Sequence, residues 1–288
     1  MPLSRLSVVG WQLAGWCNMG KGIMELGFWQ IFAAYIFIVL VLFLAHRRGI
    51  RREKELVLAS VRMTLQLILV GYVLIYIFAN PAPIMTLVIL AIMEVFAIFN
   101  IFKRTHMHGQ PKLQHSVAVA MLTGTGLCMV YFLWVVIRND PWYDPQYFIP
   151  LGGMIVGNSM TAVALGANRL LGDLQAKRSL VEGALMLGAT PQKAIAPLLR
   201  DAFDASLLPT INSMLGMGIV FLPGLMTGQI LSGVSPLVAI TYQIAVMLGI
   251  LGSVALSVFV FLQLAPRAFF NRSAQLLQDK DPSKNALP

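Results

Sequence analysis

Long apolar runs, separated by short polar segments, make up most of this chain. Each run reaches or approaches the roughly 20 residues that a helix needs to cross a bilayer. The pattern predicts an all-α, polytopic membrane protein with about seven transmembrane helices, near residues 28–45, 56–78, 84–102, 116–137, 147–167, 206–222 and 237–264. Residues 205–266 contain no Asp, Glu, Lys, Arg or His, so the last two spans lie in one uncharged stretch.

The composition supports this interpretation and excludes a soluble domain. Hydrophobic residues make up 58% of the chain and charged residues 11%, where a soluble domain carries about a quarter charged residues. The mean hydropathy is +0.76. A net charge of +9 could suggest nucleic acid in a soluble protein. In a membrane protein, Lys and Arg instead orient the chain, so we expect membrane lipid and no nucleic acid as a partner.

The distribution of Lys and Arg predicts the orientation. Of the 21 such residues, all but Arg5, Lys21 and Arg138 fall in, or next to, alternate loops and the C-terminal tail. Because positive residues accumulate in cytoplasmic loops, seven spans place the N-terminus outside and the C-terminus in the cytoplasm. We expect an N-terminal tail (1–24, with Met24 an alternative start), one permease domain (25–267) and a cytoplasmic C-terminal tail (268–288). The long loop at 168–205 is then cytoplasmic.

The chain has no nucleotide-binding motif of its own. Residues 15–21 spell the start of a phosphate-binding loop, but Gly22 stands where Ser or Thr must hold Mg²⁺, and no buried strand precedes it. Nor does the sequence show a Ser-His-Asp set or an H-E-x-x-H motif. We therefore expect no enzymatic activity and no cofactor in this chain.

Few polar residues interrupt the spans, and these define a candidate translocation path. Arg62 could act there or extend its side chain to the interface. Glu94 could be functional, or its carboxyl could be kept neutral or bonded to a neighbouring helix. The amides are expected to bond between helices or to meet substrate. The sixteen methionines could fill gaps or offer sulfur to a soft metal, and no metal ligands are assigned. The full candidate set is Arg62, Gln66, Glu94, Asn158, Asn212, Gln229 and Gln243.

Two glycine pairs suggest helix packing. Gly153-x-x-x-Gly157 and Gly224-x-x-x-Gly228 have the spacing that lets transmembrane helices approach closely.

The segment 182–209 is the one long polar-amphipathic stretch among the spans. It predicts two short helices joined by an elbow at residues 188–191. Thr190 is expected to be an N-cap whose hydroxyl accepts from a backbone N–H, and Pro191 suits the first helical position because its φ is preset. Such a segment between two spans suggests a docking surface for a soluble partner.

This segment carries a family resemblance. Glu182-Gly183-Ala184-x-x-x-Gly188 resembles the E-A-A-x-x-x-G signature of ABC importer permeases, with Gly183 in place of the first Ala. Residues 62–78, 150–165, 188–210 and 222–244 are similar to the FetB-type iron-export ABC permease family, whose plant relatives include an aluminium-tolerance permease. The resemblance covers about residues 30–270.

What the resemblance implies is a translocating subunit in the bacterial cytoplasmic (inner) membrane that exports iron or a related metal ion. It implies a permease homodimer and a cytoplasmic ABC ATPase subunit, which binds ATP and Mg²⁺. Pro209 and the nearby glycines would let the sixth span bend. The implied ATPase-coupling residues are Glu182, Gly183, Ala184, Gly188, Ala189, Thr190, Pro191, Arg200 and Asp201.

Two other functions remain open. An ion-coupled secondary transporter would need several intramembrane acids or bases and inverted repeats, whereas the spans offer Glu94 and Arg62. A non-transporting membrane anchor or regulator of an ATPase would share the docking segment and would lack transport.

Overall fold

The computed structural model describes residues 27–49, 53–105, 111–138 and 141–270. The predicted N-terminal tail, with Met1 and Met24, and most of the C-terminal tail lie outside these residues. The described chain is helical, apart from turns and one isolated bridge between Met217 and Phe221. Its elements are α2 (Phe28–Ala34), α3 (Ile36–Arg47), α4 (Glu53–Ala79), α5 (Pro83–Arg104), α6 (Pro111–Tyr131), the π-helix η1 (Phe132–Ile137), α7 (Pro145–Ala176), α8 (Arg178–Met186), α9 (Pro191–Gly216), α10 (Gly224–Leu231), α11 (Pro236–Leu264) and α12 (Pro266–Phe269).

The predicted all-α membrane fold is confirmed. Six helices in the described part of the chain are long and apolar enough to cross a membrane. They fall at six of the seven predicted positions, and their ends differ from the predicted ends by at most nine residues, at Ala176: Trp29–Arg47, Glu53–Ala79, Pro83–Arg104, Pro111–Ile137, Pro145–Ala176 and Pro236–Phe269. The seven-span count and the orientation stay predictions.

The remaining predicted span, 206–222, is not an independent helix. Its first part is the C-terminal half of α9, a continuous helix that begins at Pro191 and ends at Gly216. The prediction of a short second helix after the elbow was therefore wrong. The sequence interpretation placed a boundary where charge ends, but backbone hydrogen bonds continue regardless of side-chain polarity. The helix even accommodates Pro197 and Pro209 in its interior.

The loop predicted at 168–205 is also mostly helical. Helix α7 continues from the fifth span to Ala176, and α8 follows after Lys177. This segment thus consists of the end of α7, all of α8 and the first part of α9.

The described residues form two compact units. One contains the chain up to Asn80 together with Gly224–Ile240, and the other contains 81–223 and the chain from Thr241 onward. In the first unit, α3 contacts α4, and the hydroxyls of Tyr35 and Thr64 form a hydrogen bond between them. At the end of α3, His46 Nδ1 lies 2.9 Å from Glu53 Oε1. Most other side chains of α3 and α4 are apolar and exposed.

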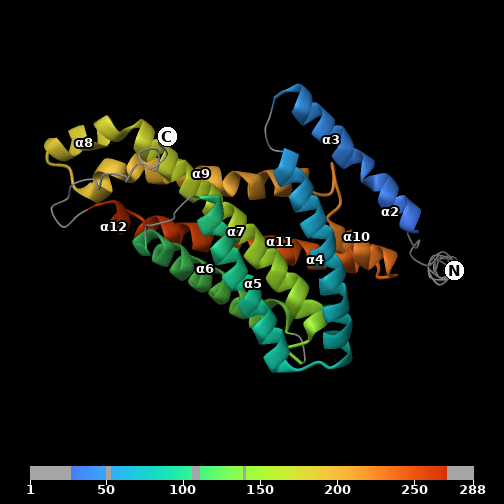
Figure 1. Ribbon diagram of the computed structural model, residues 1–288. Coiled ribbons are helices and arrows are strands. Elements are labelled where there is room, and N and C mark those ends of the chain that lie inside the picture. Colours follow the sequence, from blue (N-terminus) through green and yellow to red (C-terminus); the bar gives the residue numbers. More distant parts are fainter. Residues whose placement is uncertain (1–26, 50–52, 106–110, 139–140, 271–288) are drawn as a thin grey trace, which may run out of the picture. The chain divides into compact units, whose positions relative to one another are not determined.

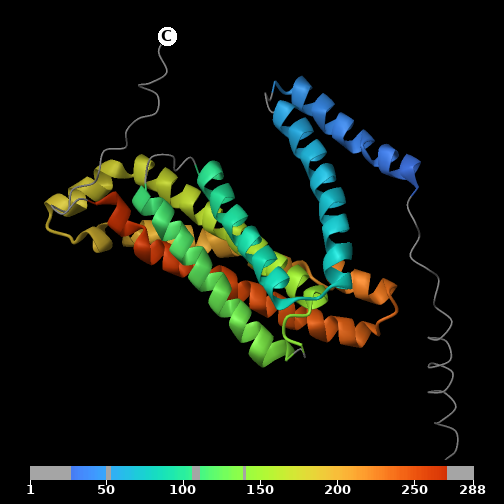
Figure 2. The same cartoon turned by 60° about the horizontal axis from the view of Figure 1, so that its bottom comes forward.

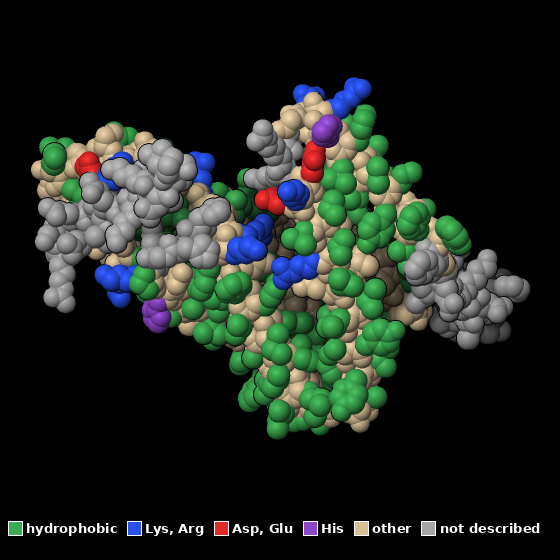
Figure 3. Space-filling view, in the orientation of Figure 1, with side chains coloured by type: hydrophobic (Ala, Val, Ile, Leu, Met, Phe, Trp, Pro, Cys, Tyr) green, Lys and Arg blue, Asp and Glu red, His purple; other side chains and the backbone are tan. Residues whose placement is uncertain are grey.

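The second unit holds the larger core. Helix α7 packs against α5, α6 and α9, and these helices run side by side in Figure 1 and Figure 2. Between α7 and α11, the hydroxyls of Ser159 and Ser253 form a buried 2.8 Å hydrogen bond. Hydrophobic side chains gather over the lower part of the face in Figure 3, where few charged side chains are seen, as expected of helices in lipid. The most deeply buried large side chains include Ile101, Leu113, Met121, Leu170, Ile195 and Phe261.

Close helix approach occurs at glycines other than those of the predicted pairs. A Cβ added at Gly157, Gly224 or Gly228 would meet nothing within 4 Å, and at Gly153 only the tip of Met93. In contrast, a Cβ at Gly124 would lie 2.6 Å from the backbone nitrogen of Ser257 on α11. The spacing rule failed because rotation of each helix, which the sequence does not display, decides which glycine faces a neighbour.

Candidate functional site

The elbow after α8 is built by its own residues. Gly188 has φ +87°, a left-handed conformation that glycine adopts without the steric cost of a Cβ. Its N–H donates to the carbonyl of Leu185, and the N–H of Ala189 donates to the carbonyl of Ala184, each at 3.0 Å. These two bonds make the Schellman ending that satisfies the last carbonyls of a helix. The predicted elbow is confirmed at this position.

Helix α9 begins as predicted, with one difference. Thr190 is the N-cap with extended backbone (φ −69°, ψ 150°), and Pro191 is the first helical residue. The Thr190 hydroxyl makes no capping hydrogen bond, so that part of the prediction was wrong. The fixed φ of Pro191 and the missing N–H at that position suffice to start the helix.

Charged pairs stiffen the elbow segment. Glu182 Oε1 accepts a hydrogen bond from Arg178 Nε at 2.8 Å, one helical turn apart. Lys177 Nζ lies 3.6 Å from Asp201 Oδ2, so it links the start of α8 to α9. These pairs are partly exposed, and pairs of this kind contribute well under about 1 kcal/mol each. The Lys177–Asp201 pair joins the start of α8 to α9, whereas the Arg178–Glu182 pair lies within α8.

Arg200 lies away from the elbow tip. It is exposed on α9 and lines a surface groove between α9 and α11 with Phe203, Asp204 and Phe259. The structure therefore separates the predicted coupling residues into two groups: Glu182 to Pro191 at the elbow, and Arg200 with Asp201 further along α9.

The elbow has one buried side and an exposed apolar tip. Val181 on α8 and Ile195 and Leu198 on α9 are buried. In contrast, Met186 is 88% exposed and Leu187 is 91% exposed. Two large apolar side chains at the tip of an otherwise polar segment are the kind of feature that marks a protein-binding surface.

Three candidate path residues belong to the first unit. Arg62 and Gln66 lie one turn apart on α4, and both are exposed. Gln229 on α10 is half-buried, and its side-chain oxygen has no hydrogen-bond partner among the described residues. Arg62 and Gln66 share one face of α4, but the structure does not bring Gln229 together with them.

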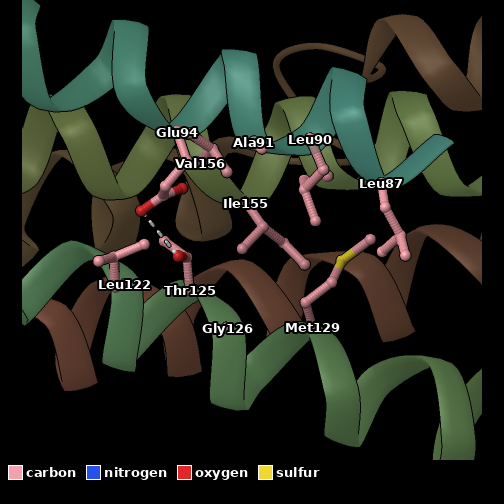
Figure 4. Close-up of a pocket in the computed structure, with 11 residues that line it drawn as sticks. Leu87, Leu90, Ala91, Glu94, Leu122, Thr125, Gly126, Met129, Ile155 and Val156 are labelled. Carbon is pink, nitrogen blue, oxygen red and sulfur yellow. Dashed lines mark hydrogen bonds between the residues drawn. The ribbon is translucent and has the colours of Figure 1, made fainter. Parts of the chain in front are cut away.

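Glu94 lies in the second unit, at one end of a cavity between α5, α6 and α7 (Figure 4). It is 6% exposed. The Thr125 hydroxyl lies 3.1 Å from Glu94 Oε1 and 2.6 Å from the carbonyl oxygen of Met121, so its single proton is shared between these two acceptors. The cavity holds about 190 Å³ and is otherwise lined by apolar side chains and glycines. Glu94 is thus bonded to a neighbouring helix, α6, and its place in a translocation path stays a prediction.

The amides of the second unit differ in their surroundings. Asn158 is exposed, and its side chain donates to the carbonyl of Met154 in its own helix at 2.7 Å. Asn212 is exposed on α9. Gln243 is 6% exposed on α11, and its Nε2 lies 3.9 Å from Met217 Sδ. Its Oε1 has no hydrogen-bond partner among the described residues. Of these three amides, Gln243 is the one that combines burial with a polar atom lacking a partner among the described residues.

Sequence reasoning did not predict two pairings, that of Thr125 with Glu94 and that of Met217 with Gln243. Neither carries a local signal, because a threonine or methionine in a span usually serves its own helix or fills space. In the described part of the chain, no group of three His, Cys, Asp or Glu residues could hold a metal ion.

Comparison with known proteins places these features in a family. The chain matches the uncharacterised protein family UPF0014 over residues 28–270. It is 39% identical over 231 residues to the UPF0014 membrane protein slr1647 of Synechocystis, covering 80% of this chain and 88% of that protein. It is 33% identical over 244 residues to the probable iron export permease protein FetB of Escherichia coli, covering 85% and 92% of the two chains.

A plant relative extends the comparison. The chain is 33% identical over 244 residues to Protein ALUMINUM SENSITIVE 3 of Arabidopsis thaliana, covering 85% of this chain and 88% of that protein. No solved structure matches the chain. The resemblance found in the sequence to the FetB-type permeases and their plant relatives is confirmed. The chain is an integral membrane protein and belongs to the uncharacterised protein family UPF0014.

Proposed function

We propose that this protein is the membrane-spanning permease subunit of an ABC transporter that exports iron or a related metal ion. A separate cytoplasmic ATPase subunit supplies the energy, and two copies of the permease form the transmembrane part. The observation that carries this proposal is the exposed apolar tip of the elbow, Met186 and Leu187, held on a rigid, charge-paired segment. A tip of this kind needs a partner to cover it.

Helix α9 offers a physical route from this tip to the membrane. Its 26 residues rise about 39 Å at 1.5 Å per residue. One end begins at the elbow and the other lies in the uncharged stretch after Asp204. Because the helix is continuous, a displacement at Pro191 moves its apolar half as well. Movement of the ATPase can thus shift the transmembrane helices as a two-state element.

The cargo is proposed from the relatives. The name of one of them states probable iron export, and another is named for aluminium sensitivity. Both suggest a metal ion. The described residues hold no cluster of charged metal ligands, which suits a transporter because cargo must leave its site as readily as it enters.

Co-purification with the ATPase tests the partnership. Burying a leucine contributes about 1.5–3 kcal/mol. Leu187→Ser should therefore lower the affinity of the permease for the ATPase at least about tenfold, so that less ATPase is retained. Gln192→Ser is the matched control, an exposed residue near the same elbow that carries no apolar surface. Glu182→Ala should also reduce retention, while membrane insertion stays intact. If the Leu187 and Glu182 variants both keep the ATPase, the elbow is not its docking surface.

Transport assays separate the remaining functions. In vesicles loaded with ferrous iron, export should require the ATPase and ATP and should persist when ion gradients are collapsed. Dependence on a gradient without ATP would favour an ion-coupled secondary transporter. ATPase binding without iron movement would favour a membrane anchor or regulator. Under iron load, cells that lack the protein should retain more iron, and unchanged cellular iron would remove the export proposal.

A further inference from the structure

A basic groove lies where α6 begins and α11 ends. Lys112 and His115 on the first turns of α6 and Arg267 on α12 line this groove, which holds about 640 Å³. Helix α12 contacts both α6 and α9, and Figure 1 and Figure 2 show α12 beside the start of α6. All of these helices belong to the second compact unit, so the groove is formed within one unit.

The basic side chains of the groove have no acidic partner in the described part of the chain. Lys112, His115 and Arg267 are all exposed, and none of the four ion pairs recorded among the described residues includes them. No Asp or Glu is among the described residues that line the groove. Two cations and an imidazole without a carboxylate suit a phosphate group, which Arg and Lys bind through charge-assisted hydrogen bonds.

The rest of the groove is largely apolar, and it extends toward the membrane. Val119 and Leu264 are half-buried and line it. The span Pro111–Ile137 has 27 residues and rises about 40 Å, which exceeds the roughly 30 Å of hydrocarbon in a bilayer. Because charged side chains avoid hydrocarbon, the first turn of this span, with Lys112, lies at the level of the lipid headgroups. Val119 lies about 10 Å further along the helix, which brings it to the level of the acyl chains.

The groove lies on the same side of the second unit as the elbow. Gln263, near the end of α11, lines a neighbouring groove with Arg200 and Asp204. These two residues belong to the charged half of α9, which begins at the elbow. The predicted orientation places this side in the cytoplasm, and the cytoplasmic leaflet is the one whose anionic lipids attract basic residues at the ends of membrane spans.

We propose that this groove binds an anionic phospholipid, with Lys112 and Arg267 on the headgroup phosphate and Val119 and Leu264 against an acyl chain. A soluble phosphate compound would use the cations and leave the apolar lining uncovered. A lipid without net charge would use the apolar lining and leave the two cations unneutralised. The anionic lipid satisfies both parts, and it links α6 to α12. Its binding needs neither the ATPase nor the metal ion, so it goes beyond the proposed function.

Thermal unfolding of the full chain measures this binding, because a ligand of the folded state raises the Tm as its concentration rises. The permease in neutral detergent is titrated with phosphatidylglycerol and, separately, with phosphatidylcholine that carries the same acyl chains. Phosphatidylglycerol should raise the Tm at the lower concentration.

Variants of the two cations locate the site. Lys112→Gln and Arg267→Gln should each weaken the apparent affinity for phosphatidylglycerol about fivefold, the typical contribution of one Lys or Arg near an anionic membrane surface. Arg267→Lys should keep most of the affinity, since the charge remains. The matched control is Lys103→Gln, an exposed cation at the end of α5 that does not line the groove. This control should bind phosphatidylglycerol like the unmodified protein.

Several outcomes would overturn the lipid site. Equal stabilisation by the two lipids removes it, as does an unchanged affinity for phosphatidylglycerol in both glutamine variants. If one of these variants does not fold, the other decides. Glycerophosphoglycerol, the same headgroup without acyl chains, should raise the Tm far less than the lipid; an equal effect would make the groove a site for a soluble phosphate compound. Unchanged lipid binding together with reduced ATPase retention in the glutamine variants would make it a protein contact instead.

Discussion

The Schellman ending of α8 allows a glycine-to-alanine substitution to be compared at two positions five residues apart. We expect it to lower the local stability at one position and to raise it at the other. Gly188→Ala places a Cβ on a residue with φ +87°, which costs about 1–2 kcal/mol in the left-handed region. Nothing lies within 4 Å of that Cβ, so the cost is backbone strain alone. Gly183→Ala also meets open space but lies inside α8, where alanine stabilises a helix by about 0.5–1 kcal/mol relative to glycine.

Hydrogen–deuterium exchange of the elbow amides in nanodiscs measures this difference, because local opening follows local stability. The local stabilities of the two variants shift in opposite directions and end about 1.5–3 kcal/mol apart. Their exchange rates should therefore differ by about tenfold to a hundredfold. Gly188→Ala should exchange faster than the unmodified protein and Gly183→Ala more slowly. Equal exchange in the two variants, or slower exchange in Gly188→Ala, would refute the assignment of Gly188 as the strained end of the helix.

Two further predictions concern packing in the second unit. Gly124→Ala should lower the stability by about 1–3 kcal/mol in thermal unfolding, because its Cβ would overlap the backbone of Ser257; the same change at Gly126 meets open space and should not destabilise the protein. Thr125→Val should cost about 1–3 kcal/mol by removing the hydroxyl that bonds the buried carboxyl of α5. Thr123→Val is its control, because the exposed Thr123 hydroxyl donates to backbone carbonyls of its own helix. Equal losses of stability in the two variants would contradict the buried hydrogen bond.

Local features were the most predictable. The elbow at Gly188 and the start of α9 at Pro191 follow from the backbone preferences of those residues, which act over a few positions. The six confirmed spans follow from apolar length, because lipid excludes unpaired backbone groups and makes long helices the default. The exposed tip at Leu187 was not predicted as such, since exposure depends on which side of the elbow packs on α9.

Contacts between helices were the least predictable. The pairs Glu94–Thr125 and Gln243–Met217 join residues that are far apart in the sequence, and each depends on the rotation of two helices about their own axes. The prediction of close packing at the two glycine pairs failed for the same reason. The predicted boundary at 205 failed for another reason, because a helix can continue from a polar into an apolar environment.

The sequence by itself therefore determined the class of protein: its hydrophobic runs require membrane helices, its one polar-amphipathic segment supplies an elbow, and its motifs identify the permease family. The tertiary structure decided which polar atoms are buried together. It makes α9 one continuous helix from the elbow to Gly216, and it buries the side-chain oxygen of Gln243 without a hydrogen-bond partner among the described residues. The reason is physical: hydropathy and turn chemistry act along the chain, whereas the partner of a buried polar group is set by how helices rotate and pack.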